Sequence, residues 1–347
     1  MQKIELGTLD RLIIHHIGNK SNEDGVHLGN ELCNHDNISE ILTKLMVTNF
    51  KFDQLYQFHY FPSLELNPIY TLLTTMFDHQ DLESFVTQSQ NIAQYLYEKS
   101  NHPQIKTGEL GVFSLKHCHI GEEAVDGIGF FKSENKQKIL KVEDTQSGYK
   151  LADIEGLSIQ KLDKGCLIFN LNREQGYLVA IVDNTNKNNE AKYWTDEFLS
   201  IKPINNDYHQ TTQIMETTKQ FIAQTLDAKD EATKSEKVAL LNRSVDYFRN
   251  HQQFNANDFE QQVFAEEDLI QQYQDFSQNY MQENQLEPLN QFDISAKAVK
   301  KQQKYFKSII KLDKNFHIYI HGGKDMIEKG LDEKGRKYYK IYYQQEK

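Results

Sequence analysis

Between residues 109 and 201 the chain has a strand-like period, and this stretch limits the possible folds more than any other. It holds short apolar or alternating runs, separated by turn-like clusters such as EEAVDG, NREQG and NTNKNNE. The runs are GVFSLKHCHI, DGIGFFKSEN, KILKVE, KGCLIFNLN and GYLVAIVDN. Short strands joined by turns are typical of an antiparallel sheet. We therefore expect a mostly antiparallel sheet in the first part of the chain.

The segments before and after this stretch have apolar residues at the spacing of a helix. Residues 37–50 and 79–98 each place apolar side chains on one helical face, and the pattern is helical again from about residue 209. The predicted fold class is α+β, with flanking helices around the sheet, then a helical region, then a short C-terminal helix plus β-hairpin. We expect three domains: an α+β domain over residues 1–205, an acidic helical region over 206–290, and a basic helix with the hairpin over 291–347.

The sign of the charge changes along the chain. The protein is acidic as a whole, with a formal net charge of -11 at pH 7. Residues 1–226 hold 20 Lys and Arg against 30 Asp and Glu, residues 227–290 hold 5 against 13, and residues 291–347 hold 14 against 7. A basic end on an acidic body indicates a localised anionic partner. The alternative is a contact between this basic end and the acidic residues 258–287 of the same chain.

The basic charge is densest in SAKAVKKQQKYFKSIIK, residues 295–311, where no Asp or Glu occurs. The side chain of Ser295 can cap a helix, and we expect one helix through residue 311. At about 100° per residue, Val299, Phe306 and Ile310 share a stripe that can dock on the body. Beside it lies a row of lysines: Lys297, Lys300, Lys301, Lys304, Lys307 and Lys311. Stacked like charges weaken a helix, so an anionic partner explains them better than solubility does.

Lysine delivers a point charge to phosphate, whereas base reading uses Arg, Asn or Gln in bidentate pairs. We therefore expect contact with double-stranded DNA that is largely independent of base sequence and sensitive to salt. FHIYIH and RKYYKIYY are predicted to form one C-terminal hairpin, which adds Lys334, Arg336, Lys337 and Lys340 to the surface.

A second hypothesis is a protein-interaction module, in which acidic helices within 228–287 engage a basic partner or a second copy of the chain.

Motifs for catalysis are missing from the sequence. It holds no GxxxxGK[ST], GxGxxG, GxSxG or HExxH pattern. His117, Cys118 and His119 do not complete the four ligands of a structural zinc site, so we expect no metal, no cofactor and no enzymatic activity. A metal-dependent nuclease built from scattered acids is the less favoured alternative; the candidate acids are Asp24, Asp126, Asp153 and Asp183.

The expected compartment follows from what the sequence lacks. The three cysteines, Cys33, Cys118 and Cys166, are odd in number and widely spaced, which favours a reducing compartment. No apolar run is long enough for a signal peptide core or a membrane span. We therefore expect a cytoplasmic protein without a membrane partner.

Several stretches, taken in order, resemble the bacterial nucleoid-associated proteins of the NdpA (YejK) type. They are IIHHIGN, GIGFFKSENKQKILKV at 127–142, KGCLIFN with GYLVAIVDN, AKYWTDEFLSIKP at 191–203, YHQTTQIMETTKQFI, and FHIYIHG with KGRKYYKIYY. The resemblance covers nearly the whole chain. It implies a non-enzymatic protein of the cytoplasm that associates with the nucleoid and binds DNA. Protein partners at the nucleoid and a homo-oligomer are further alternatives. It carries no residue-level DNA site, so the lysines rest on the charge argument.

Overall fold

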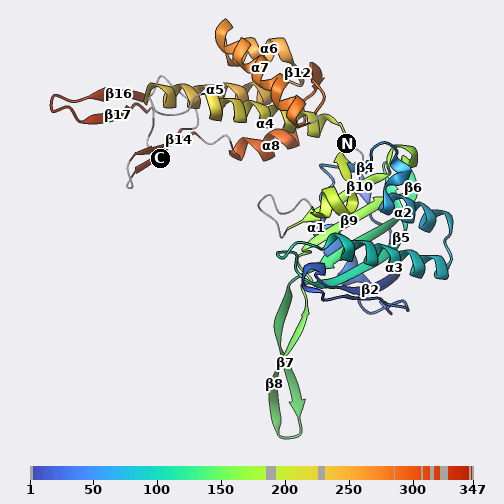
Figure 1. Ribbon diagram of the computed structural model, residues 1–347. Coiled ribbons are helices and arrows are strands. Elements are labelled where there is room, and N and C mark those ends of the chain that lie inside the picture. Colours follow the sequence, from blue (N-terminus) through green and yellow to red (C-terminus); the bar gives the residue numbers. More distant parts are fainter. Residues whose placement is uncertain are drawn as a thin grey trace. The chain divides into compact units, whose positions relative to one another are not determined.

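The computed structural model describes residues 3–184, 193–225, 231–284, 286–305, 308–312, 316–320, 327–343 and 345. The chain divides into two compact units, residues 1–204 and 205–347 (Figure 1). The predicted α+β class is confirmed, because strands dominate the first unit and helices the second. The three-domain division, with its boundary at residue 290, stays a prediction.

In the described residues of the first unit, nine strands form one sheet whose paired strands run antiparallel, as predicted. The order across the sheet is β11-β4-β10-β9-β6-β5-β2-β3, with β1 paired to β5. The strands are β1 (Ile4–Glu5), β2 (Thr8–Ile17), β3 (Val26–His27), β4 (Tyr56–Phe58), β5 (Gly108–Ile120), β6 (Glu123–Ser133), β9 (Lys164–Phe169), β10 (Leu178–Asp183) and β11 (Ile201–Pro203).

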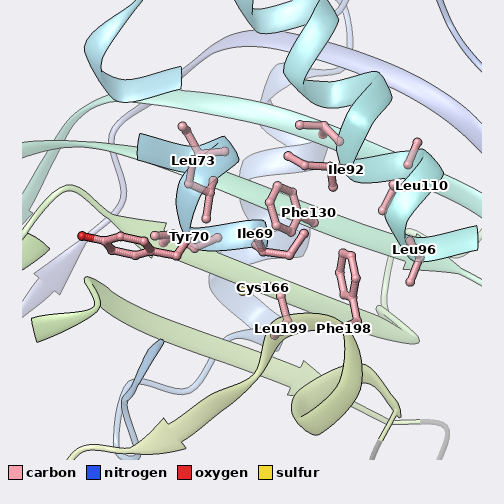
Figure 2. Packing of buried hydrophobic residues seen from close by; sticks show 14 of the residues in the cluster. Ile69, Tyr70, Leu73, Ile92, Leu96, Leu110, Phe130, Cys166, Phe198 and Leu199 are labelled. Atoms are coloured by element: carbon pink, nitrogen blue, oxygen red, sulfur yellow. The ribbon is translucent and has the colours of Figure 1, made fainter. Parts of the chain in front are cut away.

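Helices cover both faces of this sheet. The helices are α1 (Ser39–Asn49), α2 (Pro68–Asp78) and α3 (Leu82–Lys99), with a π-helical segment at Tyr193–Leu199. The apolar side chains of α2 and α3 form one buried cluster with Leu110, Phe130 and Cys166 of the sheet (Figure 2). Leu45 and Met46 of α1 belong to a second cluster, which contains Phe131 and Leu167. Because Phe130 and Phe131 are consecutive in β6, alternation sends them to opposite faces.

A buried histidine on β2 makes stability depend on pH. His15 is 1% exposed, and Nδ1 accepts a hydrogen bond from the Gly29 amide over 3.0 Å. Burial lowers the pKa of His15 from 6.5 to about 4. As the pH falls from 6.5 to 4, His15 becomes protonated in the unfolded chain but stays neutral in the folded chain. The unfolding free energy therefore decreases in that pH window.

We expect His15 to account for about 3 kcal/mol of the unfolding free energy lost between pH 6.5 and pH 4. In His15→Asn this component of the pH dependence should vanish. The side-chain oxygen of Asn can still accept the hydrogen bond from the Gly29 amide. The measurement is urea unfolding at a series of pH values. His16→Asn is the matched control, because His16 is the next residue of β2 and is exposed. An unchanged pH dependence in His15→Asn would contradict the assignment.

Two further strands, β7 (Lys136–Thr145) and β8 (Gly148–Leu157), form a separate two-stranded ribbon within the first unit, as Figure 1 shows. The sequence predicted β7 from KILKVE, but β8 was missed. We call β7, its turn and β8 the arm, residues 136–157.

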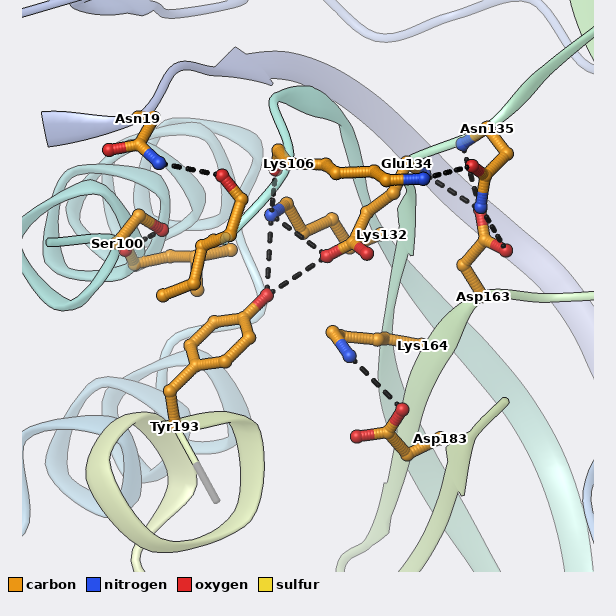
Figure 3. A network of polar contacts seen from close by, with 12 residues as sticks. Asn19, Ser100, Lys106, Lys132, Glu134, Asn135, Asp163, Lys164, Asp183 and Tyr193 are labelled. Atoms are coloured by element: carbon orange, nitrogen blue, oxygen red, sulfur yellow. Dashed lines mark hydrogen bonds and ion pairs between the residues drawn. The ribbon is translucent and has the colours of Figure 1, made fainter. Parts of the chain in front are cut away.

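A buried polar network lies where the arm leaves the sheet (Figure 3). Lys132 is fully buried, and Nζ donates to Glu134 Oε1 over 3.1 Å and to the Tyr193 hydroxyl over 3.3 Å. The Tyr193 hydroxyl in turn donates to Glu134 over 3.0 Å. Nearby, Lys164 Nζ donates to Asp183 over 3.0 Å. Both lysine ammonium groups also lie over the Tyr193 ring, so the buried cations are compensated by carboxylates and a π face.

The second unit is built mainly from helices. They are α4 (Asp207–Thr225), α5 (Glu231–Asn250), α6 (Ala256–Val263), α7 (Glu267–Glu283) and α8 (Ala296–Gln302). A buried cluster rich in aromatic side chains joins them, with Phe221, Phe264 and Tyr273 in mutual ring contact. The short strands β12 (Gln253–Asn255) and β13 (Gln291–Asp293) pair with each other, and Phe254 and Phe292 of these strands belong to the same cluster.

The predicted helix over 295–311 is wrong beyond its first turns. Helix α8 ends at Gln302 and a 3-10 turn follows at Gln303–Tyr305. Residues 308–312 form strand β14 (Ser308–Leu312), which pairs with β15 (Phe316–Ile320). Consecutive β-branched Ile309 and Ile310 favour the strand, and the cross-strand partners stabilise it.

The predicted single C-terminal hairpin is also wrong. FHIYI pairs with the upstream strand β14, and KYYKI forms β17 (Lys337–Ile341), which pairs with β16 (Ile327–Leu331). Each strand pairs with a neighbour that is close in sequence. Closing these two short loops costs less entropy than closing the long connection of the predicted hairpin.

Candidate nucleic-acid interface

Helix α8 is fixed to the second unit by its cap and by its buried face. The Ser295 side chain accepts from the Ala298 amide, and the Ser295 amide donates to Thr211 Oγ1 of α4 over 3.0 Å. Ala298, Val299 and Gln302 are buried. The Gln302 amide donates to Glu216 of α4 over 3.1 Å. Of the docking stripe predicted from Val299, Phe306 and Ile310, Val299 is buried as predicted, Phe306 lies outside the described residues, and Ile310 belongs to strand β14. Helix α8 contacts α4 and α5.

The opposite side of α8 carries exposed lysines. Lys297, Lys300 and Lys301 of α8 and Lys304 of the 3-10 turn that follows it are all exposed, and at about 100° per residue the three lysines of α8 lie within one quarter to one third of the helix circumference. Lys301 Nζ lies 5.6 Å from the ring centroid of Tyr208, and Lys304 Nζ lies 4.9 Å from that of Tyr305. We call these four lysines the α8 lysine face.

Aromatic rings from two elements support this face. Tyr305 is 54% exposed, and Lys219 Nζ of α4 lies 5.3 Å from its ring centroid. The Tyr305 ring therefore contacts two cations, Lys304 and Lys219. Arg249 of α5 donates from Nη2 to Gln303 over 2.7 Å. Cations are therefore brought to the α8 lysine face from α4 and α5, although they are distant in sequence. In the described chain, no carboxylate forms an ion pair with Lys300, Lys301 or Lys304.

The other predicted cations are distributed differently. Lys307 lies outside the described residues, and Lys311 lies on β14 opposite His317. In the β16–β17 hairpin, the four predicted cations are Lys334, Arg336, Lys337 and Lys340, all exposed. Arg336 pairs with Asp332 over 2.7 Å, and Lys340 Nζ lies 3.7 Å from Glu328. Acidic neighbours therefore offset part of this hairpin's positive charge.

The candidate metal ligands are not gathered. His117 and His119 are exposed while Cys118 is buried and accepts from the Gly7 amide, as strand alternation predicted. Of the four candidate acids, Asp126 pairs with Lys116, Asp153 with Lys138 and Asp183 with Lys164, while Asp24 accepts from the Asn19 amide. Among the residues that the structure describes, no three His, Cys, Asp or Glu side chains cluster as a metal site would require.

Three contributors to the surface were missed from the sequence: Tyr208, Lys219 and Arg249. They lie 47 to 88 positions before the first residue of α8, and only the packing of α4 and α5 brings them near it. The one signal in the sequence is that Tyr208 and Lys219 are eleven residues apart, or about three helical turns, which places them on one side of a helix.

The fold and this surface define an α+β protein with a helical second unit that displays a cationic, tyrosine-supported helix face. The family model for the nucleoid-associated protein YejK matches residues 13–335. The match spans most of the chain, so the chain belongs to this family and the predicted relationship is confirmed. A comparison with curated proteins gives no match. Within the described residues, no helix combines the length and apolar character that crossing a membrane requires.

Proposed function

We propose that the protein acts at the bacterial nucleoid in the cytoplasm and binds double-stranded DNA directly, without catalysis, through the α8 lysine face. The observation that carries this proposal is a docked helix that exposes, together with the 3-10 turn after it, four lysines, three of them without a carboxylate ion pair in the described chain. Membership of the nucleoid-associated family supports the setting.

The chemistry of this face fits phosphate. Crowded ammonium groups repel one another, and a row of phosphates removes that repulsion while releasing the counterions of the DNA. Lysine gives no bidentate base contact, so affinity should depend little on base sequence. The aromatic rings of Tyr208 and Tyr305 attract the ammonium groups of Lys301 and Lys304, which restricts these side chains before binding and lowers the entropy lost on binding. No cofactor or metal is needed for contact of this kind.

The proposal predicts a steep salt dependence. For the four lysines and some of the hairpin cations, the slope of log affinity against log salt should lie between about -4 and -7. Two duplexes of equal length and unrelated sequence should bind within about threefold of each other. The measurement is fluorescence anisotropy with labelled duplexes across a salt series. A flat salt dependence would contradict phosphate contact by this surface.

A gel-shift assay with plasmid DNA separates the alternatives. It is run with Mg²⁺ or Mn²⁺, and again with a chelator. Plasmid degradation that chelation abolishes would indicate a nuclease. Undetectable DNA binding at low salt, with retention of a basic protein partner, would favour the interaction module. For that module the relevant surface is the acidic start of α7, where Glu266, Glu267 and Asp268 are exposed. Intact plasmid with salt-sensitive binding is the expected outcome.

A further inference from the structure

The arm exposes apolar surface that nothing in the described chain covers. No residue of β7 or β8 is buried, and in the described chain the two strands pair only with each other. A two-stranded ribbon alone is marginally stable in water, and a concentration of exposed apolar side chains marks an interaction surface. The large apolar side chains that it exposes include Ile139, Leu140, Val142, Tyr149, Leu151 and Ile154.

The base of the arm is held firmly on the sheet. Asp163, which directly precedes β9, accepts from the Glu134 and Asn135 amides over 2.8 and 2.9 Å and from the Asn135 side chain over 3.0 Å (Figure 3). Lys136 pairs with Glu109 of β5 over 2.8 Å. These bonds tie the strand that enters the arm to the segment that leaves it. The arm therefore presents its edges from a fixed attachment.

The charge along β7 runs from basic to acidic. Lys136, Lys138 and Lys141 lie from the base to the middle, whereas Glu143 and Asp144 lie beside the tip. An identical strand laid antiparallel alongside β7 meets opposite charges at both ends, and a parallel copy meets like charges. Opposite charges across strands stabilise a sheet, and like charges destabilise it. The β7 edge is thus complementary to itself about a two-fold axis, the commonest symmetry of homo-oligomers.

The pairing register of the arm identifies the centre of such a contact. Thr145 pairs with Gly148 across a two-residue loop, and antiparallel pairs next to such a loop are hydrogen-bonded. Because hydrogen-bonded and non-hydrogen-bonded pairs alternate, the even-numbered residues of β7 direct their backbone groups to the outer edge. A two-fold axis at Leu140, which is 72% exposed, then places Lys136 opposite Asp144 of the second copy.

We propose that the arm is a dimerisation element, through which two copies of the chain join their β7 edges antiparallel about a two-fold axis at Leu140. The product is a four-stranded sheet that satisfies the backbone groups of both edges and covers the apolar side chains beside the axis. This contact uses the first unit only and does not depend on the proposed DNA contact of α8.

Sedimentation velocity of the full chain over a concentration series tests the proposal. The wild type should dimerise. One variant, Lys136→Glu with Lys138→Glu, makes both ends of β7 acidic, and a second, Glu143→Lys with Asp144→Lys, makes both ends basic. Each variant alone should dimerise about 100-fold more weakly, because like charges then meet at both ends of the contact. An equimolar mixture should recover the wild-type affinity as a heterodimer.

Recovery in the mixture also shows that both variants are folded, since an unfolded chain would not restore association. A monomeric wild type over the whole concentration range would overturn the proposal. Variants that each dimerise as tightly as the wild type would overturn it too, because the dimer would then use another surface. Two weakened variants that stay monomeric when mixed, with circular dichroism spectra like that of the wild type, would rule out the antiparallel β7 contact.

Discussion

Replacing Lys297, Lys300, Lys301 and Lys304 together by Gln is expected to weaken duplex DNA binding by about three orders of magnitude at about 0.1 M salt. All four side chains are exposed on α8 and the 3-10 turn that follows it, and Gln keeps helix propensity and most of the side-chain volume while removing the charge. Each lost phosphate contact should flatten the salt slope by about 0.9, so the four together remove close to 4. Anisotropy titrations across salt measure both quantities.

A matched control removes the same number of charges from the first unit. Lys44, Lys51, Lys161 and Lys202 are also exposed, and their joint replacement by Gln changes the net charge equally. This control should leave the salt slope unchanged and lower the affinity only slightly. If both variants lose affinity alike, net charge and not the α8 lysine face governs binding. If the α8 variant binds DNA as the wild type does, the helix plays no part in it.

The sheet was predictable because its information is local. In β5, β6 and β9, runs of apolar residues separated by turns identify strands whatever their partners are, and consecutive buried residues such as Phe130 and Phe131 follow from a sheet covered on both faces. The arm's second strand was not predictable in this way. Leu151, Ile154 and Leu157 are spaced three apart, which resembles a helical stripe more than an alternating strand.

The lysines of the candidate site were found because a run of like charge is visible in the sequence itself. Their arrangement was not found, since the expected helix continued through Lys311. Residues 308–312 have a strand partner in β15, and pairing outweighs the helix propensity of Lys311 there. The contacts of Tyr208 with Lys301 and of Lys219 with Tyr305 depend on tertiary packing between segments about ninety residues apart, which periodicity does not encode.

The buried ion pair between Lys132 and Glu134 should produce the largest stability change of any single substitution considered for this protein. The two side chains are 0% and 5% exposed. Glu134→Gln keeps the size of the side chain and an oxygen that can accept from Lys132, but it leaves the ammonium group without its carboxylate. Removing one partner of a buried pair lowers the unfolding free energy by about 3 to 5 kcal/mol, because the remaining charge is uncompensated. Urea unfolding at neutral pH measures the change, with the exposed Glu122→Gln as control.

The pH dependence distinguishes loss of charge compensation from loss of packing. Burial lowers the pKa of Lys132, and Glu134 opposes that shift, so Glu134→Gln should lower this pKa further. A lysine whose folded pKa lies below its unfolded value binds fewer protons in the folded state, and stability therefore rises with pH between the two values. The deficit of Glu134→Gln relative to the wild type should shrink as the pH rises toward the unfolded pKa of lysine. A deficit that stays constant would assign the loss to packing, and no deficit at all would show that Lys106, whose carbonyl oxygen accepts from Lys132 over 2.7 Å, and Tyr193 suffice to hold the buried cation.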